Sequence, residues 1–282
     1  MAEPEAVRSA ELNQRLSALL PPVLCYHRIG GPAELGVTRV AESVFARQMT
    51  TLARAGWKTL TLDQFAERLH PGHSAWPNPP SAFLLTFDDG YASLAEHVFP
   101  VLADVGFTAT TFLITDYVGR ANTWDVRYTW RRLAHLGWDS IGHWQERGFG
   151  FASHTASHPR LTWLPDAEAA AELERSRETL RHRLGSQAAR AVAYPFGARD
   201  ARIERLARAA GYELGFGGVR GGGARNGSPL ALARLPVYVW DVGGVPFGLR
   251  EGLAGALGRF IADVANRCAV GTTVMKGLGT RG

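Results

Sequence analysis

The chain has 282 residues, of which 46% are hydrophobic and 20% charged, proportions ordinary for a soluble globular protein that buries a substantial core. Its formal net charge of +5 is modest, and the basic residues are scattered rather than gathered in runs, so we expect no nucleic-acid partner. No stretch approaches the roughly 18 to 20 apolar residues of a membrane-spanning helix, and the acidic start, Met1–Glu5, is no secretory signal. We therefore expect a cytoplasmic protein, or a cell-surface or periplasmic one if a leader has been removed.

Residues 1–20 read as a charged, helix-prone lead-in, and residues 21–282 are expected to form one domain. After a strand candidate at 23–27 and a helix at 44–55, short apolar runs alternate with stretches of helical spacing. The further strands are expected at 82–87, 108–114, 149–153, 191–194, 214–216, 234–239 and 272–275. The further helices are expected at 93–105, 128–136, 166–184, 200–210 and 249–268. This alternation predicts βα units with a parallel sheet and outer helices, and seven or eight such units could close a barrel.

Two adjacent carboxylates, Asp88 and Asp89, follow the apolar run Phe83–Phe87. An Asp-Asp-Gly sequence is ordinarily a turn, because Asp and Gly favour turns. A buried strand is, however, a costly place to end with two charges, so these carboxylates call for a cation or for hydrogen-bond donors. The sequence therefore favours a functional site here over a simple turn.

Two histidines, His154 and His158, are four residues apart at the end of another expected strand. A single pair of this kind is often a surface or core feature, but the spacing lets both rings reach one ion. Two imidazoles and one carboxylate form a common catalytic zinc set with a fourth position left open for water. Parallel strands present their carboxyl ends to one face, so the aspartates and histidines can meet there. Together they indicate metal-assisted hydrolysis.

These segments resemble the motifs of the polysaccharide deacetylase family, also called carbohydrate esterase family 4 or the NodB homology domain. Residues 86–90 (Thr-Phe-Asp-Asp-Gly) are similar to its first motif, 154–158 (His-Thr-Ala-Ser-His) to its second, and 194–197 (Tyr-Pro-Phe-Gly) to its third. Residues 23–29 resemble the lead strand of members that act on poly-N-acetylglucosamine. The resemblance spans about residues 23 to 240 and implies an α/β fold, a distorted (β/α) barrel of about seven parallel strands with outer helices.

The resemblance also implies roles for particular residues. Asp89, His154 and His158 would bind a divalent metal, with Zn²⁺ as the first choice and Co²⁺ or Ni²⁺ as alternatives. Asp88 would be the catalytic base, and the backbone N–H of Phe196 would donate to the oxyanion. The physical chemistry agrees with that division, because an uncoordinated carboxylate beside the ion can accept a proton from the attacking water.

Two family residues are missing from their usual positions. An arginine that orients the base normally stands two residues before the third-motif proline, where this chain has Ala193. Arg234, just before an expected strand, is our candidate replacement, and the alternative is an ordinary surface arginine. The family's final Leu-x-His histidine, which protonates the leaving amine, is also missing, since no histidine follows His182. His27 is a candidate acid; alternatively, Asp88 shuttles the proton both ways or the enzyme is impaired.

The leading prediction is therefore a metal-dependent hydrolase that removes N-acetyl groups from a carbohydrate containing N-acetylglucosamine. One alternative is an amidase of small cyclic or linear amides, because related barrels with the same triad perform that chemistry. Another is a catalytically weak member that binds glycan or metal without turnover. Intact Asp88 argues against the last, because a pure binder needs no free carboxylate beside the ion. The sequence leaves the oligomeric state open, and Cys25 and Cys268, both among apolar residues, are expected to be buried thiols.

Overall fold

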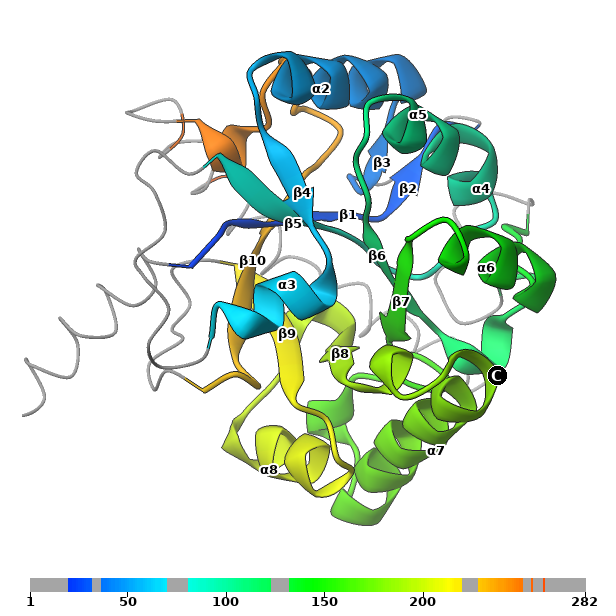
Figure 1. Ribbon diagram of the computed structural model, residues 1–282. Helices are drawn as coiled ribbons and strands as arrows, with labels where there is room; N and C mark the ends of the chain where they lie inside the picture. The colour runs from blue at the N-terminus through cyan, green and yellow to red at the C-terminus, as the bar shows by residue number, and fades with distance from the viewer. Residues whose placement is uncertain are drawn as a thin grey trace, which may run out of the picture.

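Seven parallel strands form a closed barrel at the centre of the computed structural model (Figure 1). The structure describes residues 20–31, 37–69, 81–122, 132–219 and 228–250, together with residues 255 and 261. Around the barrel the strands are β1 (Val23–Tyr26), β5 (Ala82–Phe87), β6 (Thr110–Leu113), β7 (Gly150–Ser153), β8 (Ala191–Ala193), β9 (Leu214–Val219) and β10 (Leu232–Pro236). The predicted barrel of about seven parallel strands is confirmed.

The barrel closes because β1 pairs on both sides. Its Leu24 lies in register with Leu235 of β10 on one side and with Leu85 of β5 on the other. The short strand β4 (Lys58–Leu60) pairs with the first half of β5, and β6 pairs with the second half. The first strand of the chain therefore joins the two ends of the sheet, and it brings the residues that follow it to the same end as those that follow β5.

Side chains alternate between the barrel interior and the outer layer of helices, as the two-residue period of a strand requires. One apolar cluster fills the interior and includes Val23, Leu84, Phe112, Ala193 and Phe216. Their neighbours along the strands, such as Leu24, Phe83 and Phe87, belong to a second cluster under the helices. The interior is therefore a packed core, and polar side chains among its inward positions need a partner.

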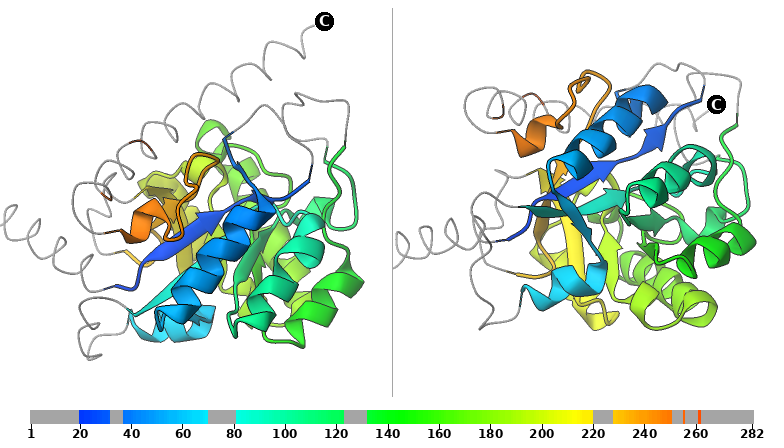
Figure 2. Two further views of the ribbon diagram at one scale, coloured as in Figure 1. Left: turned by 90° about the horizontal axis from the view of Figure 1, so that it is seen from above. Right: turned by 45° about the horizontal axis from the view of Figure 1, so that its top comes forward.

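Helices surround the barrel. They are α2 (Glu42–Arg54), α3 (Leu62–Glu67), α4 (Ser93–His97), α5 (Phe99–Asp104), α6 (Trp138–Gln145), α7 (Asp166–Leu184) and α8 (Ala201–Ala209). Figure 2 shows α2 along the outside of the barrel beside β1, where the Phe45 ring lies edge-on to Tyr26 at a centroid distance of 5.4 Å. The long helix α7 begins directly after Pro165 and ends at Gly185, whose φ of 90° is the left-handed conformation that favours glycine.

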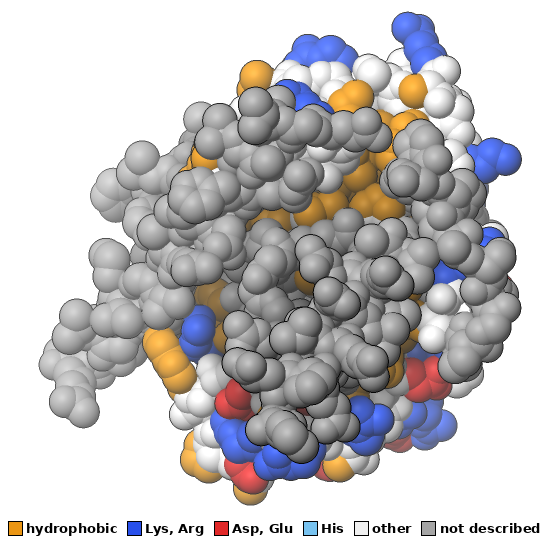
Figure 3. Space-filling view, turned by 90° about the vertical axis from the view of Figure 1, so that its left-hand side faces the viewer, with side chains coloured by type: hydrophobic (Ala, Val, Ile, Leu, Met, Phe, Trp, Pro, Cys, Tyr) orange, Lys and Arg blue, Asp and Glu red, His pale blue; other side chains and the backbone are white. Residues whose placement is uncertain are grey.

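Small elements outside the barrel complete the described chain. The strands β2 (Arg28–Ile29) and β3 (Arg39–Val40) form a separate parallel pair. On the face drawn in Figure 3, basic and acidic side chains are mixed at the lower end, toward α8. Two ion pairs involve α8: Glu204 of this helix pairs with Arg199, and its Arg202 pairs with Asp166 of α7. None of the described helices is both long and apolar enough to cross a membrane.

Several expected elements differ in the structure. The helix expected at 93–105 is two helices, because Pro100 lacks the N–H that a continuous helix needs. The described part of the helix expected at 128–136 is not helical, since Ala134 and His135 form isolated antiparallel bridges. The last barrel strand runs over 232–236 rather than 234–239. Three expected elements lie outside the described residues: the lead-in 1–20 (apart from residue 20), the strand 272–275 and nearly all of the helix 249–268.

Sequence reasoning also missed β4 and α3. A signal for α3 was present: Thr61 and Gln64 have the spacing of a capping box. In the structure the Thr61 hydroxyl accepts from the Gln64 N–H, and the Gln64 side chain accepts from the Thr61 N–H. The strand β4 has only three residues and no clear alternation, so the sequence carries little sign of it.

Candidate active site

Four of the sequence-selected residues lie just beyond the carboxyl ends of barrel strands. Asp88 and Asp89 follow β5, and His154 and His158 follow β7. All four side chains are at least nine-tenths buried. Gly90 completes the first turn, where an added Cβ would come within 2.6 Å of the Leu113 side chain, so only glycine fits without displacement. The two strand ends thus bring the carboxylates and imidazoles together, although the two pairs are more than 60 residues apart in sequence.

Asp89, His154 and His158 form a compact group of possible metal ligands. The Asp89 Oδ1 atom is 3.5 Å from His154 Nε2 and 3.6 Å from His158 Nε2, and the two Nε2 atoms are 3.2 Å apart. Ligand atoms about 2.0–2.2 Å from a tetrahedral zinc ion lie about 3.3–3.6 Å from one another. The three side chains therefore fit a divalent metal in both donor type and spacing.

Hydrogen bonding prepares His154 to act as a ligand. Its Nδ1 donates to the carbonyl of Ala193 at 2.8 Å, which leaves the lone pair of Nε2 facing Asp89. Burial lowers the pKa of this imidazole, and the attraction of Asp88 offsets only part of that effect, so the ring is held neutral. Ala193 thus contributes through its backbone, at the position where the family arginine is missing.

Backbone strain is concentrated around the same residues. The non-glycine residues in the described chain with positive φ are Asp89, Thr155, His158 and Phe196, at 60 to 70°. Left-handed backbone of this kind costs on the order of 1–3 kcal/mol per residue and persists where the surrounding structure imposes it. All four residues lie at or beside the strand ends that form the site, so the fold maintains this local geometry at a cost in stability.

Arg234 binds Asp88 with both ends of its guanidinium group. Its Nη1 donates to Oδ1 at 2.6 Å and its Nη2 donates to Oδ2 at 2.7 Å, and both side chains are buried. Burial alone would raise the pKa of the Asp88 carboxyl, but the charge and hydrogen bonds of Arg234 lower it well below its usual value. Asp88 is therefore held ionised and oriented, with its Oδ2 atom 3.8 Å from His154 Nε2.

An irregularity in the sheet accompanies the position of Arg234 in β10. The register between β9 and β10 shifts between Ala233 and Arg234. Such shifts redirect side chains and are frequent near active sites. The Arg234 guanidinium lies inside the barrel, 5.5 Å from the centroid of the Phe112 ring. Arg234 is thus not a surface residue, and its buried charge is compensated by Asp88.

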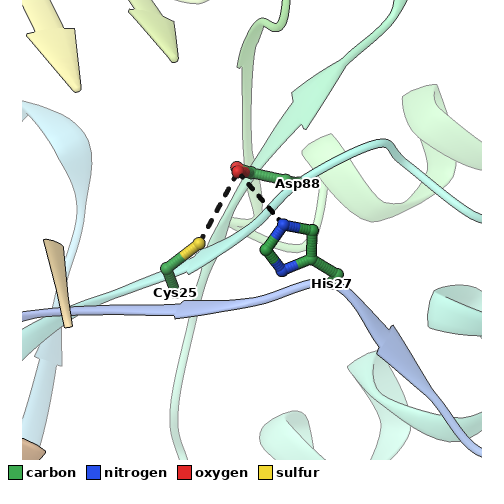
Figure 4. A group of neighbouring side chains, drawn as sticks. All are labelled: Cys25, His27 and Asp88. Carbon is green, nitrogen blue, oxygen red and sulfur yellow. Dashed lines mark hydrogen bonds and ion pairs between the residues drawn. The ribbon is translucent and has the colours of Figure 1, made fainter. Parts of the chain in front are cut away.

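Two residues of the first strand region contact the same carboxylate, as Figure 4 shows. Cys25 of β1 is 3.6 Å from Asp88 Oδ2 through its Sγ, and His27, just beyond β1, is 3.8 Å from that oxygen through its Nε2. Burial raises the pKa of the Cys25 thiol strongly, so it is neutral. Burial likewise lowers the pKa of His27 to about 4, against the attraction of Asp88, although a quarter of its side chain is exposed.

Phe196 and His135 complete the surroundings of the triad. The Phe196 ring packs against His158 at a centroid distance of 4.9 Å. The His135 ring packs against the rings of Tyr91 and Tyr117, and its Nδ1 donates to the Asp89 carbonyl at 2.8 Å, so it supports the strained turn that carries this carboxylate. Sequence reasoning missed His135, because a lone histidine in an expected helix has no pattern that links it to a residue 46 positions earlier.

Comparison with known proteins agrees with these motifs. A family model described as polysaccharide deacetylase matches residues 76–215. That range contains Asp88, Asp89, His154, His158 and Phe196, whereas Cys25, His27 and Arg234 lie outside it. The residues around Asp88 therefore come partly from the matched region and partly from the segments of β1 and β10, which lie outside it.

Two curated relatives carry related names. The chain is 28% identical over 218 residues to YxkH of Bacillus subtilis (strain 168), provisionally named a polysaccharide deacetylase, covering 77% of this chain and 71% of the relative. It is 26% identical over 198 residues to the poly-beta-1,6-N-acetyl-D-glucosamine N-deacetylase of Staphylococcus epidermidis, covering 67% of this chain and 64% of that protein.

Solved structures share the fold. IcaB from Ammonifex degensii superposes with a TM-score of 0.63 at 26% identity, covering 77% of this chain and 91% of its own. The Streptococcus pyogenes deacetylase PplD, solved with acetate, superposes with a TM-score of 0.65 at 22% identity, covering 78% and 93% of the two chains, and supports the fold alone. Residues 76–215 therefore form a polysaccharide deacetylase domain, the family that the motifs predicted.

Proposed function

We propose that this protein is a metal-dependent deacetylase that removes N-acetyl groups from a glycan containing N-acetylglucosamine. One observation carries the proposal: a ligand triad of suitable spacing adjoins a buried carboxylate that Arg234 holds ionised. A protein that only bound metal or sugar would have no use for the second carboxylate, whose burial is costly without such a partner.

Asp89, His154 and His158 would hold the ion, with Zn²⁺ as the first choice and Co²⁺ or Ni²⁺ as alternatives. When bound, a divalent ion supplies Lewis-acid chemistry, which polarises a carbonyl group and lowers the pKa of a coordinated water toward about 7. The two imidazoles and one carboxylate of the triad are a donor set typical of catalytic zinc.

Asp88 acts in this proposal as the general base. It accepts a proton from the water that attacks the acetyl carbonyl, and Arg234 keeps both carboxylate oxygens oriented for that transfer. The Phe196 N–H donates to the oxygen of the acetyl group, where negative charge develops. The products are acetate and a free amine on the sugar, so the amine must receive a proton.

Asp88 is the better carrier of that proton. Because the pKa of His27 is lowered to about 4, its ring is neutral at pH 7 and holds no proton ready to give. A carboxyl group stabilised as the anion by Arg234 gives up a captured proton readily. We therefore propose that Asp88 takes the proton from water and returns it to the amine, and that His27 assists through its position beside Oδ2.

The first substrate to test is poly-β-1,6-N-acetylglucosamine, because the staphylococcal relative is named for that polymer. We expect the metal-loaded protein to release acetate from its oligosaccharides, a chelator to abolish release, and Zn²⁺ or Co²⁺ to restore it. β-1,4-linked oligosaccharides and small linear and cyclic amides form the comparison panel. Activity confined to small amides, or metal uptake without any hydrolysis, would overturn the glycan deacetylase assignment.

Substitutions separate the base from the ligands. Asp88→Asn should retain the ion but lower kcat by at least about 10³-fold, because the base is lost and the ligands are intact. His154→Ala should lose the ion. For both variants we would measure the metal content by elemental analysis and the rate of acetate release. The control is His182→Ala, which removes an exposed histidine that has neither of these roles. A rate for Asp88→Asn within a few-fold of the unmodified protein would show that the base is another group.

The proton route has its own test. His27→Gln should lower kcat less than about tenfold if Asp88 returns the proton, since the glutamine removes only an assisting group. The comparison with Asp88→Asn is made on the same oligosaccharide at saturating concentration. A loss as large as that of Asp88→Asn, with metal content unchanged, would instead make His27 the acid.

A further inference from the structure

A second group of metal-ligating side chains adjoins the first. Cys25, His27 and Asp88 each offer one ligand atom, and these atoms lie within 4.8 Å of one another (Figure 4). The group combines a thiol, an imidazole and a carboxylate, three of the usual zinc ligands. The proposed mechanism uses Asp88 as a base and makes no use of Cys25, so this group needs its own explanation.

The spacing of these atoms suits one tetrahedral ion. With a Zn–S distance of about 2.3 Å and Zn–O and Zn–N distances of about 2.0–2.2 Å, ligand atoms are expected about 3.4–3.6 Å apart. Cys25 Sγ is 3.6 Å and His27 Nε2 is 3.8 Å from the same oxygen, Asp88 Oδ2. The ligand atoms of Cys25 and His27 lie within 4.8 Å of each other, so closing the site would take a shift of His27, a quarter of whose side chain is exposed.

The site has a route for access but also a built-in weakness. Cys25 and Asp88 are buried, so an ion would enter past His27, the exposed member of the group. Among the described residues, His27 Nδ1 has no hydrogen-bond partner to orient the ring. Arg234 Nη2 already donates to Asp88 Oδ2 at 2.7 Å, so an incoming cation must share that oxygen with a guanidinium. This group should therefore bind more weakly than the triad of Asp89, His154 and His158.

We propose that Cys25, His27 and Asp88 form a second, inhibitory site for a thiophilic divalent cation such as Zn²⁺ or Cd²⁺. Binding exchanges the thiol proton of Cys25, released to solvent, for a metal–sulfur bond. It also engages the Oδ2 atom of Asp88, which can then no longer accept a proton. The inhibitory part rests on the proposed function, because it requires Asp88 to be the base; the binding part does not.

Cobalt spectroscopy tests the binding part without reference to activity. Co²⁺ is added to the metal-free 282-residue chain under reducing, anaerobic conditions. The triad has only nitrogen and oxygen ligands, so a thiolate-to-cobalt charge-transfer band reports Cys25. We expect this band to grow with the second equivalent in the unmodified protein and in Cys268→Ala, and to be absent from Cys25→Ala and Cys25→Ser. A band that survives in both Cys25 variants, or no band in any protein, would overturn the site.

Inhibition of acetate release tests the second part. Cys25 is not in the proposed catalytic machinery, so Cys25→Ala with one equivalent of Zn²⁺ should release acetate at the rate of the unmodified protein. If the alanine variant unfolds, Cys25→Ser takes its place. Losing an outer-sphere partner costs about 10- to 100-fold in metal affinity, so losing a direct ligand should raise the half-inhibitory Zn²⁺ concentration at least about tenfold. Equal half-inhibitory concentrations would overturn the inhibitory role. Failure of the proposed function would appear separately, as no acetate release from any of these proteins.

Discussion

At the scale of single residues, Asp88 stays ionised in a buried position because Arg234 donates to both of its oxygens. The arginine in turn keeps its proton: burial lowers the pKa of Arg234, but the charge and hydrogen bonds of Asp88, together with the nearby Cys25 and Asp89, raise it above the usual value. Neither charge is stable in this position without the other, because desolvation of an uncompensated ion is expensive. The pair therefore serves both the orientation of the base and the integrity of the barrel interior.

Removing the arginine should be costly. Arg234→Ala leaves Asp88 buried without its main partner, and breaking a buried pair in this way costs about 3–5 kcal/mol of unfolding free energy. Urea denaturation of the metal-free protein would measure the loss. The control is Arg190→Ala, which removes a partly exposed arginine that pairs with Asp63 and Glu213 and should cost no more than about 1 kcal/mol per pair. Equal costs for the two variants would contradict the role given to Arg234.

Residue-level reasoning reached part of this arrangement from the sequence. Arg234 was predicted to replace the arginine that is missing at position 193, but the sequence could not exclude a surface position for it. The position became clear only when β10 lay next to β1, with a register shift beside the arginine. Cys25 was expected to be a buried thiol and is buried, but its contact with Asp88 joins residues 63 positions apart and leaves no local pattern.

At the scale of elements, the turns after β5, β7 and β8 share one property. Each contains at least one non-glycine residue with positive φ, from Asp89 to Phe196. Propensity alone would not select these conformations, and tertiary contacts hold them, such as the His135 hydrogen bond to Asp89. Helices were predicted best where local signals were complete: at α8, for example, the Asp200 side chain accepts from the Ile203 N–H as an N-cap.

The segment after β10 contains a titratable residue that affects stability. Asp241 is buried, and burial raises its pKa to about 6 although the Phe247 N–H and Arg250 oppose the shift. Because its ordinary pKa is 3.8, the folded protein binds a proton between about pH 4 and 6 that the unfolded chain does not. This residue therefore favours the folded state at pH 4, and that contribution is lost as the pH rises through 6.

An asparagine at this position should remove the pH dependence. At pH 8, Asp241→Asn is expected to be more stable than the unmodified protein by up to about 3 kcal/mol, at 1.36 kcal/mol per pKa unit. At pH 4 the two should be nearly equal, because both side chains are then uncharged. Denaturation at pH 4, 6 and 8 would measure the difference. A difference that did not change with pH would show that Asp241 has an ordinary pKa in the folded protein.

At the scale of the whole molecule, barrel closure depends on strands that lie outside the region matched by the family model. Residues 76–215 include β5 to β8 and only the start of β9, whereas β1 and β10 close the ring. Those two strands also carry Cys25 and Arg234, and β1 leads directly to His27. The site around Asp88 is therefore complete only in the closed barrel.

A fragment restricted to residues 76–215 should therefore fail to fold. Without β1 and β10, the edges of β5 and β9 would have no partner strand, and unpaired edges promote aggregation. The Asp88 carboxylate would also lose Arg234. We expect the fragment to aggregate or to unfold without a cooperative transition, and we expect the 282-residue chain to unfold cooperatively. Size-exclusion chromatography and thermal denaturation would compare them. A monomeric fragment with a sharp transition would show that barrel closure is dispensable.

The sequence by itself determined the α/β class, the parallel direction of the strands and the resemblance to the family, because these follow from periodicity and from short contiguous motifs. Only the tertiary structure decided which strand closes the barrel, that Arg234 reaches Asp88, and that Cys25, His27 and His135 gather around the two aspartates. The reason is physical. Periodicity records which face of each element is buried, whereas pairing across the barrel depends on register and packing between segments far apart in the chain.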